Sequence, residues 1–229
     1  MPAWLRWVLG TVVVLIVAGG PFAFFRYEYA HAKRFREVVP GRFYRSGQLT
    51  ADGFREVFEK YRIRTVINLQ HENPDPHLPN RWMGKPIIRE SEICKAHNVN
   101  YILLTPDILP EPNSVETRPP VVDDYLKILD DETNYPILVH CKAGLHRTGR
   151  LTAIYRMEYE GWSIGASMRE LRDNGYGYIA ASENDPYVIQ FVQNYQPRKV
   201  TSGESRVASP PSHATRHLPH ATLKTGERP

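Results

Sequence analysis

The chain has 229 residues, 41% hydrophobic and 24% charged, which is ordinary for a globular protein with room for one well-packed domain. Its net charge of +4 arises from Gln196 onward, where six Lys or Arg face two Glu, so the remainder is neutral. The basic character therefore gives no reason to expect a nucleic-acid partner. Two cysteines, Cys94 and Cys141, are too few for a disulfide scaffold, although one bridge between them stays open.

The first expected element is an apolar helix. Trp7–Phe25 carries no charge over 19 residues, close to the ~20 that cross a bilayer. We interpret residues 1–31 as an N-terminal membrane anchor with a single transmembrane helix. The alternative is a cleaved signal peptide, whose apolar core usually spans ~7–15 residues. Six Lys or Arg lie just after the span and only Arg6 precedes it, so the positive-inside rule favours a cytoplasmic location for the domain on its C-terminal side.

Residues 32–196 are expected to form one domain of alternating strands and helices. Short apolar runs typical of buried strands lie at Val66–Leu69, Tyr101–Leu104 and Pro136–Cys141. Helical periodicity appears after Thr50, which is the expected N-cap, after Pro119–Pro120 and around Val188–Tyr195. This order predicts an α/β fold with a mostly parallel central sheet flanked by helices, and an active site beyond the carboxyl ends of the strands.

The last segment, residues 197–229, is rich in Pro, Ser, Thr, His and Arg. It has too few large apolar residues to offset its chain entropy, so we interpret it as a disordered basic tail. Its histidines, His213, His217 and His220, are expected to be solvated and to bind no metal.

The motif that carries chemistry is "VHCKAGLHRTGR", Val139–Arg150. An expected strand runs into Cys141, the seven residues Cys141–Arg147 are expected to form the turn, and a helix is expected after it. Backbone N–H groups in such a turn can form an anion-binding nest, and the start of the helix adds a positive dipole end. The same environment stabilises a thiolate. Arg147 adds a planar fork that matches two phosphate oxygens.

"HCKAGLHRTG" resembles the H-C-x5-R-T-G signature of cysteine-dependent protein tyrosine and dual-specificity phosphatases. The matching residues are His140, Cys141, Gly144, Arg147, Thr148 and Gly149. Gly41–Thr50 is similar to the opening hairpin of the small dual-specificity branch, which includes bacterial and fungal members. Arg64–Glu72 is similar to that branch's next strand and loop. The resemblance implies the phosphatase fold and no cofactor or metal.

The resemblance also implies roles for individual residues. Cys141 would attack phosphorus and form a cysteinyl-phosphate, which water then hydrolyses. Thr148 would ease departure of the thiolate. His140 would fix the loop by hydrogen bonding, without transferring protons, and Gly149 would support it. Asp107, after the strand that precedes the motif, would be the general acid, with Asp75 as the reserve candidate. The residues expected to bind the phosphate are Lys142, Ala143, Gly144, Leu145, His146 and Arg147.

The substrate class is left open between a phosphorylated protein and a polyphosphorylated small molecule or lipid. Lys142 after the cysteine is similar to phosphoinositide phosphatases, and His146 before the arginine to inositol-pyrophosphate phosphatases. Lys142, His146 and Arg150 are expected to rim the mouth of the pocket, where their positive charges could face the ligand. Leu145 departs from the first pattern, and Lys142 and Arg150 could equally point away as solvated surface residues. The alternative function is a catalytically silent, membrane-anchored module that binds phosphorylated ligands.

Overall fold

The structure, a computed structural model, describes residues 2–80, 84–104, 119–174 and 191–198. The predicted tail lies outside the described residues except for Pro197 and Arg198. Of the predicted helix around Val188–Tyr195, residues 191–195 are described, and residues 191–194 of these are helical.

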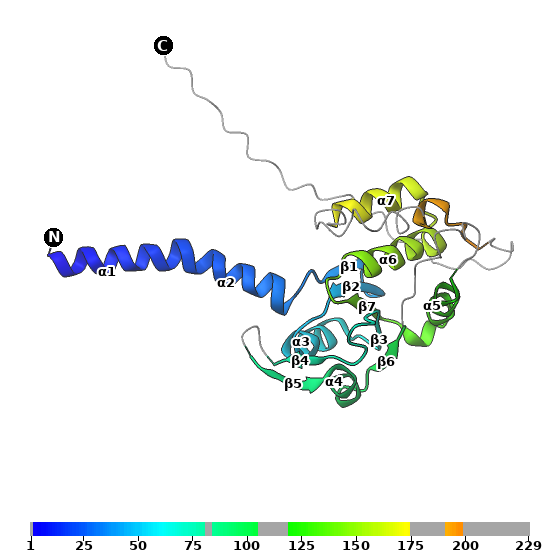
Figure 1. Cartoon of the computed structure of the whole chain (residues 1–229), viewed down its shortest axis with the longest axis horizontal. Helices are drawn as coiled ribbons and strands as arrows, with labels where there is room; N and C mark the ends of the chain where they lie inside the picture. Colours follow the sequence, from blue (N-terminus) through cyan, green and yellow to red (C-terminus); the bar gives the residue numbers. More distant parts are fainter. Residues whose placement is uncertain (1, 81–83, 105–118, 175–190, 199–229) are drawn as a thin grey trace, which may run out of the picture. The chain divides into compact units, whose positions relative to one another are not determined.

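The described part of the chain begins with helix and then alternates strands with helices (Figure 1). The strands are β1 (Arg36–Val39), β2 (Phe43–Gly47), β3 (Thr65–Asn68), β4 (His77–Pro79), β5 (Pro86–Arg89), β6 (Asn100–Leu103) and β7 (Ile137–Cys141). The helices are α1 (Ala3–Val14), α2 (Gly20–Arg26), α3 (Ala51–Tyr61), α4 (Glu90–Ala96), α5 (Pro120–Asp130), α6 (His146–Tyr159) and α7 (Ile164–Asp173). Three short helical turns are η1 (Leu15–Gly19), η2 (Tyr27–His31) and η3 (Glu132–Asn134).

The N-terminal helical segment is long and apolar. Ala3–Arg26 spans 24 residues with a hydropathy of 2.3, and none of its most apolar stretch is buried against the rest of the chain. This exposure argues against a core helix. Its length and composition suit a membrane span, and a signal sequence near the N-terminus has the same properties.

The central sheet has the order β1-β2-β7-β3-β6. β2, β7, β3 and β6 are parallel, and β1 pairs antiparallel with β2 at the edge. The predicted α/β fold with a mostly parallel sheet is therefore confirmed. The hairpin expected over Gly41–Thr50 begins earlier than the resemblance implied, because β1 starts at Arg36 and Gly41 forms the turn with a φ of +72°.

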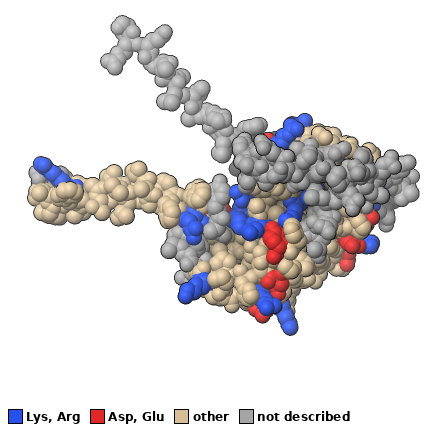
Figure 2. Space-filling model, in the orientation of Figure 1, with Lys and Arg blue, Asp and Glu red and all other residues tan. Residues whose placement is uncertain are grey.

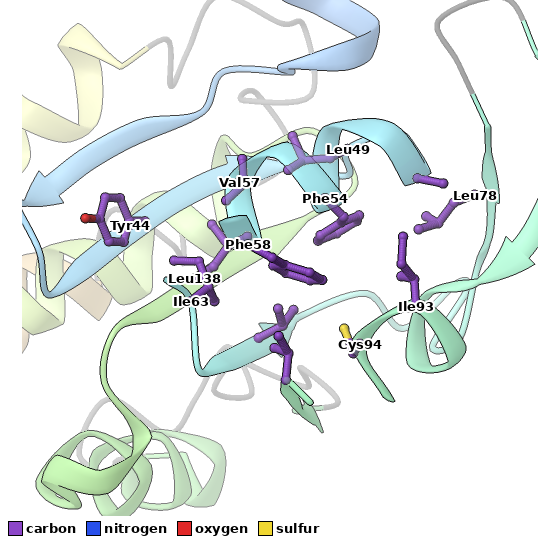
Figure 3. Close-up of a cluster of buried hydrophobic side chains, with 13 residues drawn as sticks. Tyr44, Leu49, Phe54, Val57, Phe58, Ile63, Leu78, Ile93, Cys94 and Leu138 are labelled. Carbon is purple, nitrogen blue, oxygen red and sulfur yellow. The ribbon is translucent and has the colours of Figure 1, made fainter. Parts of the chain in front are cut away.

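Helices cover both faces of the sheet, as alternation along β2 illustrates. Tyr44 belongs to a buried cluster with Phe54 and Phe58 of α3, on the face that α4 also covers (Figure 3). Its neighbour Phe43 points to the other face and stacks on Tyr155 of α6, with ring centroids 4.1 Å apart. Packing on both faces holds each strand in place along its own axis, and so positions the loop after β7.

Two further features concern the ends of elements. The Thr50 side chain accepts a hydrogen bond from the Gly53 N–H, so the predicted N-cap of α3 is confirmed. β4 and β5 form a separate two-stranded antiparallel sheet, which the sequence patterns did not predict. β5 runs directly into α4, so the first residue of that helix, Glu90, has its place fixed by both elements.

Candidate active site

Cys141 is the last residue of β7, the middle strand of the sheet. It lies level with Gly47 at the end of β2, and its neighbour His140 lies level with Asn68 at the end of β3. The cysteine is therefore at the carboxyl edge of three parallel strands, where ligands bind in open α/β sheets. Its side chain is 4% exposed.

The loop after Cys141 curls around the sulfur. The Gly144 N–H donates a hydrogen bond to the Cys141 Sγ, with nitrogen and sulfur 3.2 Å apart. Gly144 has a φ of +73°, and a Cβ there would lie 2.4 Å from the Gly47 nitrogen. Glycine is required both by the left-handed backbone and by the close approach to β2.

Helix α6 begins at His146, one residue before Arg147. The loop between strand and helix is thus Lys142–Leu145, shorter than the seven-residue turn that the sequence indicated. The first turn of α6 packs closely against Leu171 of α7. A Cβ at Gly149 would lie 2.5 Å from Cδ1 of Leu171, so glycine leaves the room that this contact needs. The positive end of the helix dipole therefore adjoins the loop that surrounds the Cys141 sulfur.

Arg147 is oriented by an acid that the sequence analysis did not identify. Its Nη1 donates to Oε2 of Glu72 at 2.7 Å, and its contact with the Leu69 carbonyl is longer, at 3.5 Å. Burial would raise the pKa of Glu72, but the hydrogen bonds from Arg147 and from the backbone N–H of Glu72, together with the charges of Arg147 and His71, outweigh it and lower the pKa to about 2. Glu72 comes after β3 in "QHEN", so a carboxylate at a strand end was the available signal.

A second arginine supports the loop from beneath. Arg45 of β2 is 3% exposed, and its Nη2 donates to the Gly144 carbonyl at 2.9 Å. Burial lowers the pKa of the Arg45 guanidinium to about 10, so it remains charged at neutral pH. Arg45 therefore holds the Gly144 peptide and adds a positive charge beside the loop. Nothing in the local pattern of β2 distinguished it from an exposed strand residue.

His140 and Thr148 flank the loop and are both fully buried. The His140 Nε2 lies 2.6 Å from Oε1 of Glu90, the first residue of α4, and both side chains have no exposed surface. The Thr148 hydroxyl has no hydrogen-bond partner among the described residues. Sequence reasoning expected His140 to form a hydrogen bond but did not identify Glu90 as its partner.

The remaining loop residues differ in exposure. Lys142 is exposed, Ala143 and His146 are half-buried, and Leu145 is buried. Arg150 is 3% exposed, so the expectation that it faces a ligand at the pocket mouth or solvates the surface was wrong. The reason is that residues 148–157 of α6 are buried between the sheet and neighbouring helices, which leaves Arg150 no solvent face.

The candidate acids lie in different settings. Asp107 lies outside the described residues. Asp75 accepts hydrogen bonds from the Ser91 N–H and hydroxyl, both at 3.0 Å, and so caps the start of α4. Asp123 and Asp124 are exposed on α5, as expected for surface acids.

The second cysteine and the metal-binding side chains lie apart from this chemistry. Cys94 is a buried free thiol on α4, and burial raises its pKa well above the usual range. Cys141 is also free, so the possible disulfide is absent. Among the residues that the structure describes, no group of three His, Cys, Asp or Glu side chains could hold a metal ion.

Comparison with known proteins identifies the family. A model of the tyrosine phosphatase family matches residues 30–209. The dual specificity protein phosphatase TpbA of Pseudomonas aeruginosa is 23% identical over 184 residues, covering 76% of this chain and 74% of that protein. The inositol diphosphatase DSP3 of Arabidopsis thaliana is 40% identical over 137 residues, covering 60% of each chain.

A solved structure supports the fold. The core catalytic domain of the PP-IP phosphatase SIW14 from S. cerevisiae, in complex with citrate, has a TM-score of 0.52 and 21% identity. The match covers 72% of this chain and 86% of that one. The family match extends over the sheet, the turn that follows Cys141 and helix α6. The chain therefore belongs to the tyrosine phosphatase family and is a cysteine-dependent phosphatase.

Proposed function

We propose that the protein hydrolyses phosphate monoesters in two steps, with Cys141 as the nucleophile. In the first step the Sγ–P bond forms while the bond from phosphorus to the leaving oxygen breaks. In the second step water forms a new P–O bond, the S–P bond breaks, and inorganic phosphate leaves with the thiolate restored. The hydrogen bond from the Gly144 N–H to the Cys141 Sγ carries this proposal, because it favours a charged sulfur at the start of a helix.

The loop Lys142–Arg147 would hold the three oxygens of the transferred phosphoryl group. Its backbone N–H groups and the α6 dipole supply positive potential where charge gathers in the transition state. Arg147 supplies a fork-shaped guanidinium, which Glu72 keeps oriented. Arg45 fixes the Gly144 carbonyl, so the peptide cannot turn its oxygen toward the bound anion.

Protons require further groups. We assign general acid catalysis to Asp107, which would protonate the leaving oxygen in the first step. The capping role of Asp75 at α4 leaves its carboxylate engaged with Ser91, which argues against the reserve assignment. The buried hydroxyl of Thr148 would donate a hydrogen bond to the departing sulfur. His140 and Gly149 would position the loop without contacting the reacting atoms.

For the substrate we propose a multiply phosphorylated small molecule or lipid. Lys142 is exposed beside Cys141, where it can meet a charge outside the loop. Two relatives support this class by name, the inositol diphosphatase from Arabidopsis and the PP-IP phosphatase from yeast. A phosphorylated protein is the second candidate, because TpbA is named a dual specificity protein phosphatase. Neither candidate is a nucleic acid.

We further propose the domain boundaries and location that the sequence suggests. Residues 1–31 would anchor the protein in a membrane as a single-pass helix, residues 32–196 would form the phosphatase domain, and residues 197–229 a disordered tail. The apolar helix Ala3–Arg26 supports the anchor. The basic residues just after it support a cytoplasmic catalytic domain.

Trapping the covalent intermediate tests the chemistry. The full chain, in a nonionic detergent, is mixed with a radiolabelled aryl phosphate and quenched in acid, and the labelled residue is located by mass spectrometry. We expect label on Cys141, none in Cys141→Ser, and unchanged labelling in Cys94→Ser. Turnover near the wild-type rate in Cys141→Ser would contradict the mechanism, and turnover that stops on adding a chelator would indicate a metal requirement instead.

A further inference from the structure

The segment that links the N-terminal helix to the sheet is held against the candidate active site. The carbonyl of Lys33 accepts a hydrogen bond from the Gly47 N–H at 2.7 Å. Nη1 of Arg34 donates to the Ala143 carbonyl at 3.0 Å. Gly47 lies level with Cys141 in the sheet. Ala143 belongs to the segment Lys142–Arg147 that we propose to bind phosphate, here called the phosphate loop. Lys33 and Arg34 are thus fixed to the two stretches of chain that frame the catalytic cysteine.

The backbone of this segment is strained. Lys33 has a φ of +33° and Arg34 a φ of +60°, in a region that costs a residue with a side chain about 1–3 kcal/mol. Such a conformation persists only when surrounding contacts impose it. Just beyond, Phe35 stacks on Tyr44 with ring centroids 5.6 Å apart, which fixes the exit of the turn.

The Lys33 side chain runs from the turn toward the loop. A Cβ at Gly47 would lie 2.7 Å from Cγ of Lys33 and 3.0 Å from the Ala143 carbonyl oxygen. The aliphatic stem of Lys33 and the phosphate loop therefore both pack on the same glycine. Lys33 is half-buried, so its ammonium is carried to the rim of the loop by a stem that has little freedom to move away.

Several positive charges meet there. Burial lowers the pKa of Lys33, Arg34 and Lys142 lower it further, and the Cys141 sulfur raises it. Figure 2 shows Lys and Arg atoms close to a few Asp or Glu atoms near the middle of the face in view. The charges of Arg34 and Lys142 both disfavour the charged form of Lys33, and an anion that entered between them would relieve this repulsion.

We propose that Lys33, Arg34 and Lys142 form a second anion subsite beside the Cys141 loop, which takes a second phosphate group of the substrate. This inference rests on the proposed function, since the first phosphate must occupy the loop. A phosphate dianion suits the subsite better than a carboxylate does, because it carries up to two charges and several acceptor oxygens to set against three cations. The subsite makes the linker after η2 a determinant of specificity, although its residues lie more than a hundred positions before the signature motif.

The test compares two substrates across matched variants of the full chain in nonionic detergent. The substrates are inositol hexakisphosphate and a small aryl phosphate, and the quantity is the ratio of their kcat/KM values. Lys33→Met keeps the stem that packs on Gly47 and removes the charge. Lys33→Arg restores the charge. Lys60→Met removes an exposed charge at the far end of α3 and serves as the control.

We expect Lys33→Met to lower the ratio about tenfold, a loss of about 1.4 kcal/mol in binding. Lys33→Arg should recover most of the ratio, Lys60→Met should leave it unchanged, and added salt should shrink the difference. A ratio in Lys33→Met equal to that in Lys60→Met would overturn the proposal. So would an equal loss on a phosphotyrosine peptide, because that would show a general effect on the loop.

The source of the second phosphate is distinguished by a further arm with phosphatidylcholine vesicles that contain a phosphatidylinositol bisphosphate. A selective loss on either polyphosphate supports the subsite, and the arm that shows the larger loss identifies a soluble or a lipid substrate. If wild-type protein does not turn over the aryl phosphate, the proposed function fails by itself. Calorimetric binding of inositol hexakisphosphate to Cys141→Ser, with and without Lys33→Met, then decides the subsite: equal affinities overturn it, and weaker binding with Lys33→Met supports it.

Discussion

Glu90 and His140 form a buried pair directly behind the candidate nucleophile, with Oε1 of the acid 2.6 Å from Nε2 of the ring and no exposed surface on either side chain. A distance this short between two buried polar atoms identifies a hydrogen bond. Glu90 begins α4 and His140 precedes Cys141 on β7, so the pair also joins the helix layer to the catalytic strand.

Glu90→Ala should destabilise the protein by about 3–5 kcal/mol, because it leaves the imidazole of His140 buried without its partner. Glu90→Gln keeps an amide within reach of the ring and should cost less, about 1–3 kcal/mol. Urea denaturation of the three proteins measures both values. Equal stability of Glu90→Ala and wild type would show that the pair contributes nothing to the fold.

Arg45→Met should lower kcat for an aryl phosphate about a hundredfold, a loss typical of misplaced catalytic groups. The substitution keeps an apolar stem in the core but removes the donor to the Gly144 carbonyl. A purely structural loss would leave the chemistry of the cysteine unchanged. The discriminating measurement is therefore kcat against KM: a misplaced loop should lower kcat more than it raises KM in Arg45→Met, and Arg45→Lys, which restores a donor and a charge, should recover part of kcat.

Glu72 should contribute stability that depends on acidity. Its pKa is lowered to about 2 in the folded protein, against about 4.3 in an unfolded chain. The contribution is therefore fully present above about pH 5 and is lost as the pH falls toward 2. Because the pair is partly exposed, we expect only about 0.5–1 kcal/mol. Denaturation midpoints of wild type and Glu72→Gln should converge on acidification through this window, and a constant difference would refute the role of the carboxylate charge.

The sequence predicted well those features that are built from residues close together in the chain. Cys141, Gly144 and Arg147 follow one another through the end of a strand, a loop and the start of a helix. The hydrophobic pattern of the strand, the glycine and the arginine therefore indicated an anion site from a few neighbouring residues. The alternation of strands and helices similarly predicted the sheet. Both inferences need only local backbone preferences and hydrophobic pattern.

The supporting residues could not be predicted in the same way. Arg45, Glu72 and Glu90 reach the loop from β2, from the segment after β3 and from α4, and their partners lie 50 to 99 positions away. Only the register of the sheet brings them together. The prediction for Arg150 was wrong for the opposite reason. Because Arg150 is close to Arg147 in sequence, it was expected at the rim of the pocket, whereas packing around α6 buries it.

The full-length protein should fractionate with membranes and resist extraction by high salt or alkaline carbonate, because Ala3–Arg26 has the length and hydropathy of a membrane span. Deleting residues 1–27 should release a soluble protein that keeps its activity on an aryl phosphate. This truncation retains Lys33 and Arg34. Intact-mass measurement of the natural protein provides the decisive control, since a mature chain that begins near Gly20 would indicate a cleaved signal peptide.

Asp107→Asn should slow hydrolysis of an alkyl phosphate by about 10²–10⁴-fold, the usual contribution of a general acid. An alkoxide is a poor leaving group and needs the proton as the P–O bond breaks. A nitrophenolate leaves readily without one, so the same variant should lose much less activity on p-nitrophenyl phosphate. The acid limb of the kcat profile should be retained in Asp107→Asn, while the alkaline limb set by the acid should flatten.

Asp75→Asn is the matched control, because it makes the same change at the acid that caps α4 through Ser91. An amide oxygen can still accept one of those two hydrogen bonds, so we expect a small loss of stability. On each of the two substrates the rate should equal that of the wild type. A leaving-group dependence that appeared in Asp75→Asn and not in Asp107→Asn would transfer the role of general acid to Asp75. The protonating group would then come from the segment between β3 and β4, next to the Glu72 that orients Arg147.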